Sequence, residues 1–130
     1  MILLDTSALY ALADAGDSFH EEALRIFDKL AGAGEELLVH NYVIAETAAL
    51  LEARAGHEAS VRFLRDIAEI ETVWVDATLH RDAVSLLNRF KSREISLVDC
   101  VSFVVMRQKD IATAFAFDKH FVHQGFKLAS

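Results

Sequence analysis

Residues 96–106 have the sequence SLVDCVSFVVM, and this stretch decides how the rest of the chain is arranged. It predicts a helix that is apolar on every side, and such a helix belongs in the middle of a domain rather than on its surface. The stretch is too short to cross a bilayer, so a buried core helix is expected. Its one carboxylate, Asp99, falls in the first turn, where free backbone N–H groups and the helix macrodipole favour an anion.

Two interpretations of Asp99 follow from its position. Ser96 and Asp99 have the spacing of a capping box, a variant of the usual Ser/Thr-x-x-Glu, and for an isolated carboxylate this interpretation is favoured. The alternative is a functional carboxylate at the edge of the core, supported by Ser96. Three more carboxylates that are predicted to converge on Asp99 favour this alternative.

Composition limits the class of protein. The chain of 130 residues has no Pro-rich or Ser-rich linker, which predicts a single domain over residues 1–130. No apolar run is long enough for a membrane span, and the N-terminal MILLD reaches a charge too early for a signal peptide. The single cysteine, Cys100, lies in the apolar helix, which suits a packing role in a reducing cytoplasm. We therefore expect a cytoplasmic protein without membrane contact.

The formal net charge of −7 argues against a protein that coats nucleic acid through a broad positive surface. It is compatible with a cluster of metal-binding carboxylates, because a bound cation reverses the local field.

Short apolar runs alternate with helical patterns along the chain. Strands are predicted at residues 2–4, 37–40, 73–75, 113–117 and 126–128. Helices are predicted from Thr6 or Ser7 to residue 13, and over 19–30, 42–54, 57–70, 79–90 and 96–106, with Ser18, Asn41 and Thr78 as N-caps. This alternation predicts a three-layer α/β/α fold with a central, mostly parallel sheet of four to five short strands.

Four carboxylates are the candidate site residues. Asp5 and Asp118 directly follow predicted strands, and the carboxyl ends of parallel strands form the rim where ligand sites occur. Glu46 shares one helix stripe with apolar neighbours such as Val43 and Leu50, which predicts that it is buried with a partner or points into a pocket. Together with Asp99, these residues are expected to lie at one site.

Several like charges in one pocket repel each other, so a hard divalent cation is the economical way to hold them. Mg²⁺ or Mn²⁺ takes oxygen ligands, whereas zinc is disfavoured because the His and Cys residues show no paired ligand spacing. Arg89, Lys91 and Arg93 form the densest basic patch, either as C-terminal charges of the helix at 79–90 or as a phosphate clamp. A carboxylate-held cation beside such a clamp suits phosphodiester hydrolysis, with Glu46 or Asp118 positioning the attacking water.

The chain resembles the PIN-domain ribonucleases, and within them the VapC toxins of toxin–antitoxin pairs. The resemblance rests on DTS at 5–7, NYVIAET at 41–47, SLVDC at 96–100 and AFAFDKHF at 114–121. It implies a catalytic and metal-binding quartet of Asp5, Glu46, Asp99 and Asp118, with a supporting hydroxyl from Thr6 or Ser7. It also implies Mg²⁺-dependent RNA cleavage, homodimerisation and inhibition by a cognate antitoxin. Lys119, which follows the fourth carboxylate, joins the basic patch as a predicted RNA contact.

Other functions fit parts of the pattern. A catalytically silent PIN-like interaction module would have the same fold. A phosphoacceptor receiver-like domain would need an acidic pair after the first strand and an acceptor after the third; Asp76 is in the second position, but Asp5 has no acidic neighbour. The nuclease interpretation is compatible with one or two metal ions, and with either a toxin or a housekeeping enzyme.

Overall fold

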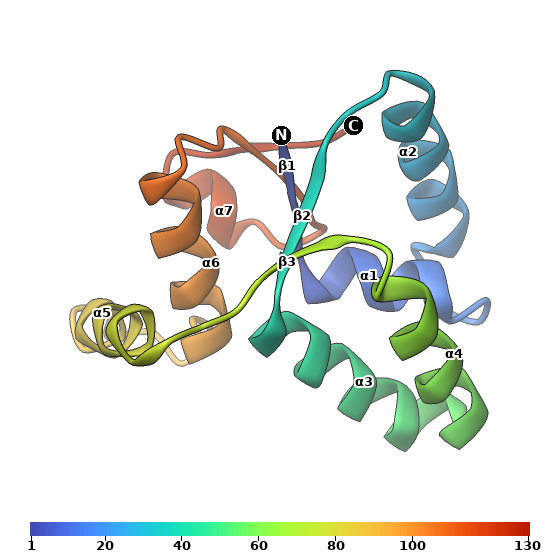
Figure 1. Ribbon diagram of the computed structural model, residues 1–130, viewed down its shortest axis with the longest axis horizontal. Coiled ribbons are helices and arrows are strands. Elements are labelled where there is room, and N and C mark those ends of the chain that lie inside the picture. Colours follow the sequence, from blue (N-terminus) through green and yellow to red (C-terminus); the bar gives the residue numbers. More distant parts are fainter.

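Five short strands form one parallel sheet in the computed structural model of the protein, which describes residues 1–130 (Figure 1). They are β1 (Ile2–Leu4), β2 (Leu37–His40), β3 (Glu71–Val73), β4 (Thr113–Phe115) and β5 (Lys127–Leu128). Their order in the sheet is β3-β2-β1-β4-β5, and every neighbouring pair is parallel. The predicted parallel sheet is therefore confirmed.

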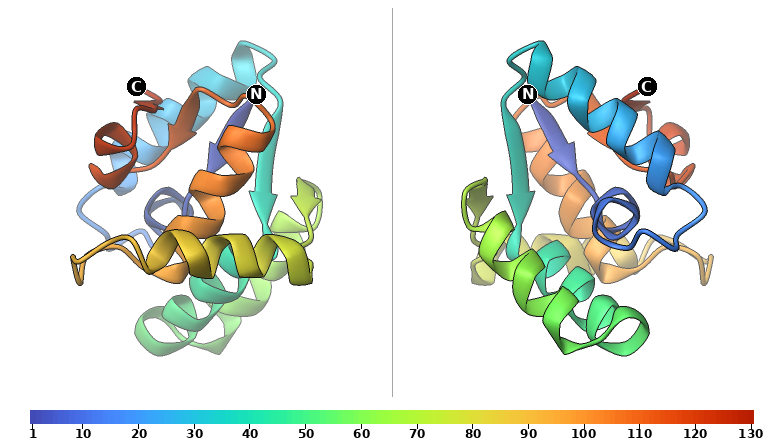
Figure 2. Two further views of the ribbon diagram at one scale, coloured as in Figure 1. Left: turned by 90° about the vertical axis from the view of Figure 1, so that its left-hand side faces the viewer. Right: turned by 90° about the vertical axis from the view of Figure 1, so that its right-hand side faces the viewer.

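Seven helices connect and cover the strands. They are α1 (Thr6–Ala13), α2 (His20–Gly32), α3 (Asn41–Ala55), α4 (His57–Ile67), α5 (Ala77–Leu87), α6 (Leu97–Gln108) and α7 (His120–His123). In Figures 1 and 2, α5, α6 and α7 cover one face of the sheet, while α1, α2 and α4 lie on the other. No helix has the length and apolar character that a membrane crossing would require.

The alternation of side chains along β1 separates two hydrophobic cores. Ile2 and Leu4 pack into the core that includes residues of α1 to α4, whereas Leu3 packs into the core formed with α5, α6 and α7. Successive residues of a strand point to opposite faces, so this central strand contributes to both cores. The three-layer α/β/α architecture is confirmed, and the apolar helix α6 is buried as predicted.

Three predicted helix N-caps are wrong, and in each case a neighbouring side chain makes the capping contact or fixes the helix start. Asp17, rather than Ser18, fixes the start of α2: its carboxylate accepts a hydrogen bond from the Phe19 N–H at 3.0 Å, and Phe19 is the N-cap. Asp76 caps α5 by accepting from the Leu79 N–H at 2.8 Å, which displaces Thr78 into the helix.

His40 caps α3 because the side chain of Asn41 is used elsewhere. Asn41 Oδ1 accepts a hydrogen bond from the Val75 N–H at 2.6 Å, while the His40 ring accepts from the Val43 N–H at 3.3 Å. The other ring nitrogen of His40 lies 2.8 Å from Ser102 Oγ. Burial lowers the pKa of His40 to about 4, so the ring is neutral and links β2 to α6.

Other predicted boundaries also move. The third strand ends at Val73 rather than Val75, because its neighbour β2 ends at His40, the residue paired with Val73. Helix α4 ends at Ile67 and helix α5 at Leu87. Strand β4 is shorter than predicted and ends at Phe115, which leaves Phe117 and Asp118 in the segment that leads to α7.

Candidate active site

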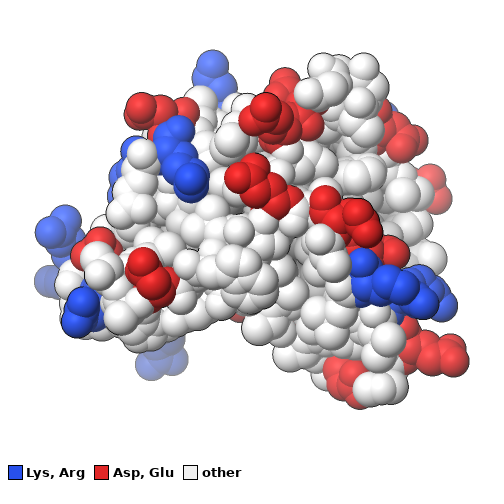
Figure 3. All heavy atoms as spheres, in the orientation of Figure 1, with Lys and Arg blue, Asp and Glu red and all other residues white.

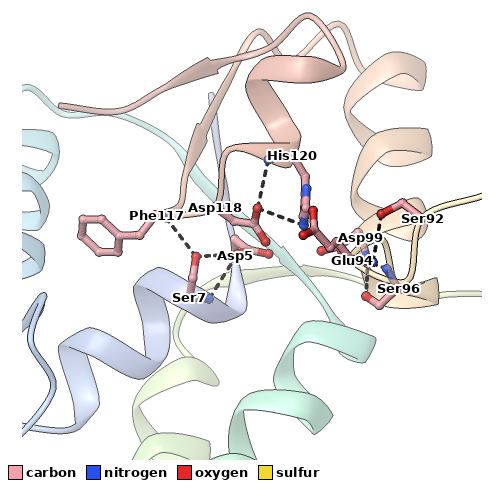
Figure 4. Close-up of polar contacts among 9 residues, drawn as sticks. All are labelled: Asp5, Ser7, Ser92, Glu94, Ser96, Asp99, Phe117, Asp118 and His120. Atoms are coloured by element: carbon pink, nitrogen blue, oxygen red, sulfur yellow. Dashed lines mark hydrogen bonds and ion pairs between the residues drawn. The ribbon is translucent and has the colours of Figure 1, made fainter. Parts of the chain in front are cut away.

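Three carboxylates from distant parts of the sequence lie at one edge of the sheet. Asp5 follows β1, Asp118 lies three residues after β4, and Asp99 lies in the first turn of α6. Strands β1 and β4 are neighbours in register, with Leu4 opposite Phe115, so both strands end at this edge. Figure 4 shows the side chains of Asp5 and Asp118 close together, with Asp99 on the side of α6.

Asp5 is the most buried of these carboxylates, with 4% of its surface exposed. Its Oδ2 accepts hydrogen bonds from the Ser7 N–H at 3.1 Å and the Ser7 hydroxyl at 2.6 Å, and it caps α1. Burial raises the pKa of Asp5 to about 6; the Ser7 hydrogen bonds oppose this shift, and the charges of Asp99 and Asp118 add to it. The Asp5 carboxylate therefore lies in a site where negative charge is already in excess.

Asp99 forms the predicted capping box and also lies beside the other carboxylates. Its side chain accepts a hydrogen bond from the Ser96 N–H at 3.0 Å, and the Ser96 hydroxyl accepts one from the Asp99 N–H at 3.1 Å, which completes the capping box. Burial, followed by the charge of Asp118, nevertheless raises the pKa of Asp99. The cap orients a carboxylate that also faces the cluster.

His120 belongs to the cluster, although it is not among the site residues predicted from the sequence. Asp118 Oδ1 accepts a hydrogen bond from the His120 N–H at 2.9 Å and lies 3.3 Å from the ring nitrogen Nε2. One ligand atom each from Asp99, Asp118 and His120 lie within 4.8 Å of one another. The signal in the sequence was the Asp-x-His spacing directly after the strand predicted at 113–117.

No lysine or arginine neutralises the clustered carboxylates. The ion pairs of the structure join the N-terminus to Glu35, Arg25 to Glu22, His57 to Glu52 and His120 to Asp118. A set of carboxylate oxygens with one imidazole nitrogen matches the donors that Mg²⁺ and especially Mn²⁺ accept. The residues therefore fit a divalent cation.

The two hydroxyls after Asp5 differ in their contacts. The Ser7 hydroxyl donates to Asp5 and accepts a hydrogen bond from the Phe117 N–H at 2.9 Å, so it ties the segment before Asp118 to the first carboxylate. Thr6 Oγ1 is the one buried side-chain polar atom without a hydrogen-bond partner. An unpaired hydroxyl costs free energy unless something binds it, and Thr6 lines the cleft beside Asp118.

The side chain of Glu46 is half-buried on α3 and makes no hydrogen bond or ion pair. Leu50 and Arg54 follow it at intervals of four residues and therefore share its face of the helix. Both line the cleft that contains Asp118. The structure has no buried partner for Glu46, and Glu46 itself does not line the cleft. Of the four carboxylates predicted to converge, Asp5, Asp99 and Asp118 act on one another, and Glu46 lies outside this cluster.

An open cleft of about 620 Å³ extends from the carboxylates across the surface. Its lining brings together the segment after β4, the loop before α2 and the face of α3. It includes Thr6, Ser7, Tyr10, Asp17, Phe19, Leu50, Arg54, Glu94, Phe117, Asp118, Lys119 and His120. Of the predicted RNA contacts, Lys119 lines this cleft; Arg54 and Glu94 were not among the sequence candidates, because their positions in the chain carry no local signal.

Arg89, Lys91 and Arg93 are not C-terminal charges of a helix, because α5 ends before them at Leu87. They are exposed residues of the loop 88–96, which projects from the body in Figure 2 and also carries Glu94 of the cleft. None of the three is in an ion pair. In the view of Figure 3, basic side chains lie mainly toward the margins, without one continuous basic surface.

The sequence and the structure both resemble known proteins. The PIN domain family matches residues 2–127. The 23S rRNA-specific endonuclease VapC20 of Mycobacterium tuberculosis is 40% identical over 97% of this chain and 95% of its own length. Ribonuclease VapC26 of the same organism is 28% identical, over 92% of this chain and 89% of its own.

Among solved structures, that of M. tuberculosis VapC20, described as a sarcin-ricin loop cleaving toxin, superposes with a TM-score of 0.86 at 38% identity, covering 97% of this chain and 96% of that one. PAE2754 from Pyrobaculum aerophilum has a TM-score of 0.61 at 23% identity, covers 98% and 87% of the two chains, and supports the fold alone.

Proposed function

Because this chain belongs to the PIN domain family, we propose that it is a VapC-type endoribonuclease that hydrolyses RNA phosphodiester bonds with a divalent cation, Mg²⁺ or Mn²⁺. The observation that carries this proposal is the convergence of Asp5, Asp99 and Asp118 without a lysine or arginine to neutralise them. Three carboxylates from separate segments, two of them with raised pKa values, are costly for a metal-free fold. Such an arrangement is expected where it serves a bound cation.

The chain's own residues have distinct tasks in this proposal. Asp5, Asp99 and Asp118 hold the cation, and Ser7 and Ser96 orient the first two of these carboxylates. When bound, the cation polarises the scissile phosphate and offsets charge on the leaving oxygen. Glu46, which has no protein partner, or Asp118 positions the attacking water and accepts its proton.

The direct test is incubation of the purified protein with RNA in Mg²⁺ or Mn²⁺, with and without EDTA. We expect cleavage in either metal and none in EDTA. The 40% identity to an endonuclease named as specific for 23S rRNA makes that RNA the first substrate to try. Cleavage that persists in EDTA would contradict the metal-dependent mechanism.

His120 is expected to tune which metal binds. Imidazole nitrogen favours Mn²⁺ over Mg²⁺, which prefers oxygen ligands. His120→Ala should therefore weaken Mn²⁺ binding, measured by titration calorimetry, by about tenfold, and Mg²⁺ binding much less. His123→Ala, an exposed histidine of the same helix, is the matched control. Equal losses of affinity for both metals would show that His120 acts through its contact with Asp118 and is not itself a metal ligand.

The basic loop is expected to bind the RNA backbone. Replacing Arg89, Lys91 and Arg93 together by alanine should weaken RNA binding and reduce the slope of log K against log salt by about 2, because each single-strand phosphate contact contributes about 0.7. Lys109→Ala, at the opposite end of α6 from Asp99, is the control. An unchanged salt slope in the triple variant would exclude the loop from the RNA contact.

Neither alternative function is favoured. An intact carboxylate cluster is not expected in a silent module. For a receiver-like domain, Asp76 would be the phosphoacceptor, but its side chain caps α5, and it is not among the charges that shift the pKa of Asp5.

We propose a cognate antitoxin and a second copy of this chain as protein partners, as in the toxin–antitoxin systems to which VapC proteins belong. An apolar groove of about 410 Å³ between α1, α2 and α4 supports a protein partner. A cytoplasmic location is proposed because Cys100, the single cysteine, is buried and free, which suits a packing role in a reducing compartment.

A further inference from the structure

Phe19 occupies a helix position where a large aromatic side chain is unusual. It is the N-cap of α2, where its side chain makes no capping hydrogen bond, and it is 46% exposed. Residues such as Ser or Asp are strongly preferred at an N-cap. The backbone there is held by Asp17, whose carboxylate accepts from the Phe19 N–H, and by the His20 ring, 2.7 Å from the Ala11 carbonyl oxygen. A large aromatic side chain is thus held at the surface where a polar residue would cap better.

The Phe19 ring stacks on Phe117, with ring centroids 4.6 Å apart and an interplanar angle of 13°. Phe117 contacts the fully buried Phe115 edge-on at 6.2 Å, so the pair is anchored to the core. Phe117 directly precedes Asp118, and its N–H donates to the Ser7 hydroxyl that also binds Asp5. Figure 4 shows the Phe117 ring extending from the carboxylates on the side away from Asp99. The aromatic pair is therefore rigidly connected to the carboxylate cluster.

The same cleft contains cations without carboxylate partners. The Arg54 guanidinium lies 5.5 Å from the centre of the Tyr10 ring and forms no ion pair, and Lys119 is exposed and likewise unpaired. Of the acidic side chains in the lining, Asp17 is engaged by the Phe19 N–H. The cleft thus combines an aromatic face with two cationic side chains that form no ion pair, which is a pattern that binds single-stranded nucleic acid.

We propose that this cleft is a nucleotide subsite for unpaired RNA, in which a base next to the scissile phosphate stacks on the exposed face of Phe19. Arg54 contacts the adjoining backbone phosphate. This inference rests on the proposed ribonuclease function and deepens it: the substrate is a single-stranded or looped RNA, because a base that is paired and stacked within a helix offers no free face to an aromatic side chain. Phe19 is a specificity-determining residue and takes no part in the chemistry.

The test measures binding, so that its failure is distinct from failure of the cleavage assay. In an Asp99→Asn background, which keeps the RNA intact, the affinity for a short labelled single-stranded RNA is measured by fluorescence anisotropy. Phe19→Ala should weaken binding by about tenfold, whereas Phe19→Trp should stay within about threefold of the parent. The matched control is Trp74→Ala, since Trp74 is a more exposed aromatic residue (72%) that does not line the cleft.

Two further readouts separate stacking from a general loss of structure. An RNA with abasic sites should bind the parent about as weakly as intact RNA binds Phe19→Ala, and a duplex of the same sequence should not distinguish the two proteins. Because Trp74 is the only tryptophan, the double variant Phe19→Trp, Trp74→Phe places a single reporter in the cleft, and its emission should be quenched by the single strand. Equal affinities of the parent and Phe19→Ala, or an unquenched reporter, would overturn the subsite.

Discussion

Asp99→Asn is expected to reduce metal-dependent RNA cleavage by at least about a hundredfold, while the protein stays folded. A ligand carboxylate supports a cation whose stabilisation of charge in the transition state is worth several kcal/mol, and each 1.36 kcal/mol corresponds to a factor of about ten in rate. The asparagine oxygen can still accept the hydrogen bond from the Ser96 N–H, so the cap of α6 is retained. The measurements are the initial cleavage rates of the parent and the variant in Mg²⁺ and in Mn²⁺, and the melting temperatures of both proteins.

The control for this variant is Asp76→Asn, which changes another aspartate at the start of a helix. Asp76 caps α5 and does not belong to the carboxylate cluster, so its variant should cleave as the parent does. Equal cleavage by the parent and by Asp99→Asn would point to a contaminating nuclease and would remove the proposed activity.

Asp5→Asn is expected to stabilise the metal-free protein by up to about 3 kcal/mol at pH 7. The pKa of Asp5 is raised from 3.8 to about 6, first of all by burial, and each pKa unit corresponds to about 1.36 kcal/mol. Asparagine removes the buried charge, and its oxygen can still accept both hydrogen bonds from Ser7. The measurement is urea unfolding in EDTA; Asp76→Asn, whose helix cap is similar, should not be stabilised.

The difference in stability between the parent and Asp5→Asn should depend on pH. Because the folded-state pKa of Asp5 lies above the unfolded value, the native state binds the extra proton between pH 3.8 and 6. The stability of the parent relative to Asp5→Asn is therefore greatest below pH 3.8 and is lost as the pH rises through 6. A difference between the two proteins that stays constant from pH 4 to 7 would contradict the assignment.

The parent's own pH profile contains an opposite contribution from His40. Its folded-state pKa of about 4 lies below the ordinary 6.5, so stability is lost as the pH falls through this interval. The difference between parent and variant removes this contribution. Addition of Mn²⁺ at pH 7 should then stabilise the parent more than Asp5→Asn, because the cation offsets the charge that the variant lacks.

Much of the fold follows from local patterns. The apolar run around Cys100 predicted the buried helix α6, and short runs such as Ile2–Leu4 predicted the strands. Alternation of these elements predicted a parallel sheet. Because the carboxyl ends of parallel strands share one edge, the sheet in turn predicted that Asp5 and Asp118 lie together there. Hydrophobic periodicity carries this information because burial of apolar surface dominates the free energy of folding.

The helix caps show where local patterns fail. Asn41 is a good capping residue by type, but its side chain binds the Val75 N–H, and His40 caps α3 in its place. Ser96 and Asp99 form the predicted capping box, and yet Asp99 also joins the carboxylate cluster. The choice between competing hydrogen-bond partners depends on segments that packing brings together, and sequence spacing does not report it.

The sequence alone determined that the protein is a layered α/β domain with acidic residues at the carboxyl ends of its strands. Only the tertiary structure decided which further side chains lie beside these carboxylates: His120 next to Asp118, and Arg54 and Phe19 along the cleft. The physical reason is the separation along the chain of the residues that interact. Strand and helix patterns act over a few residues of the chain, whereas a metal site and a cleft depend on distances between segments about a hundred residues apart, which only the packed core establishes.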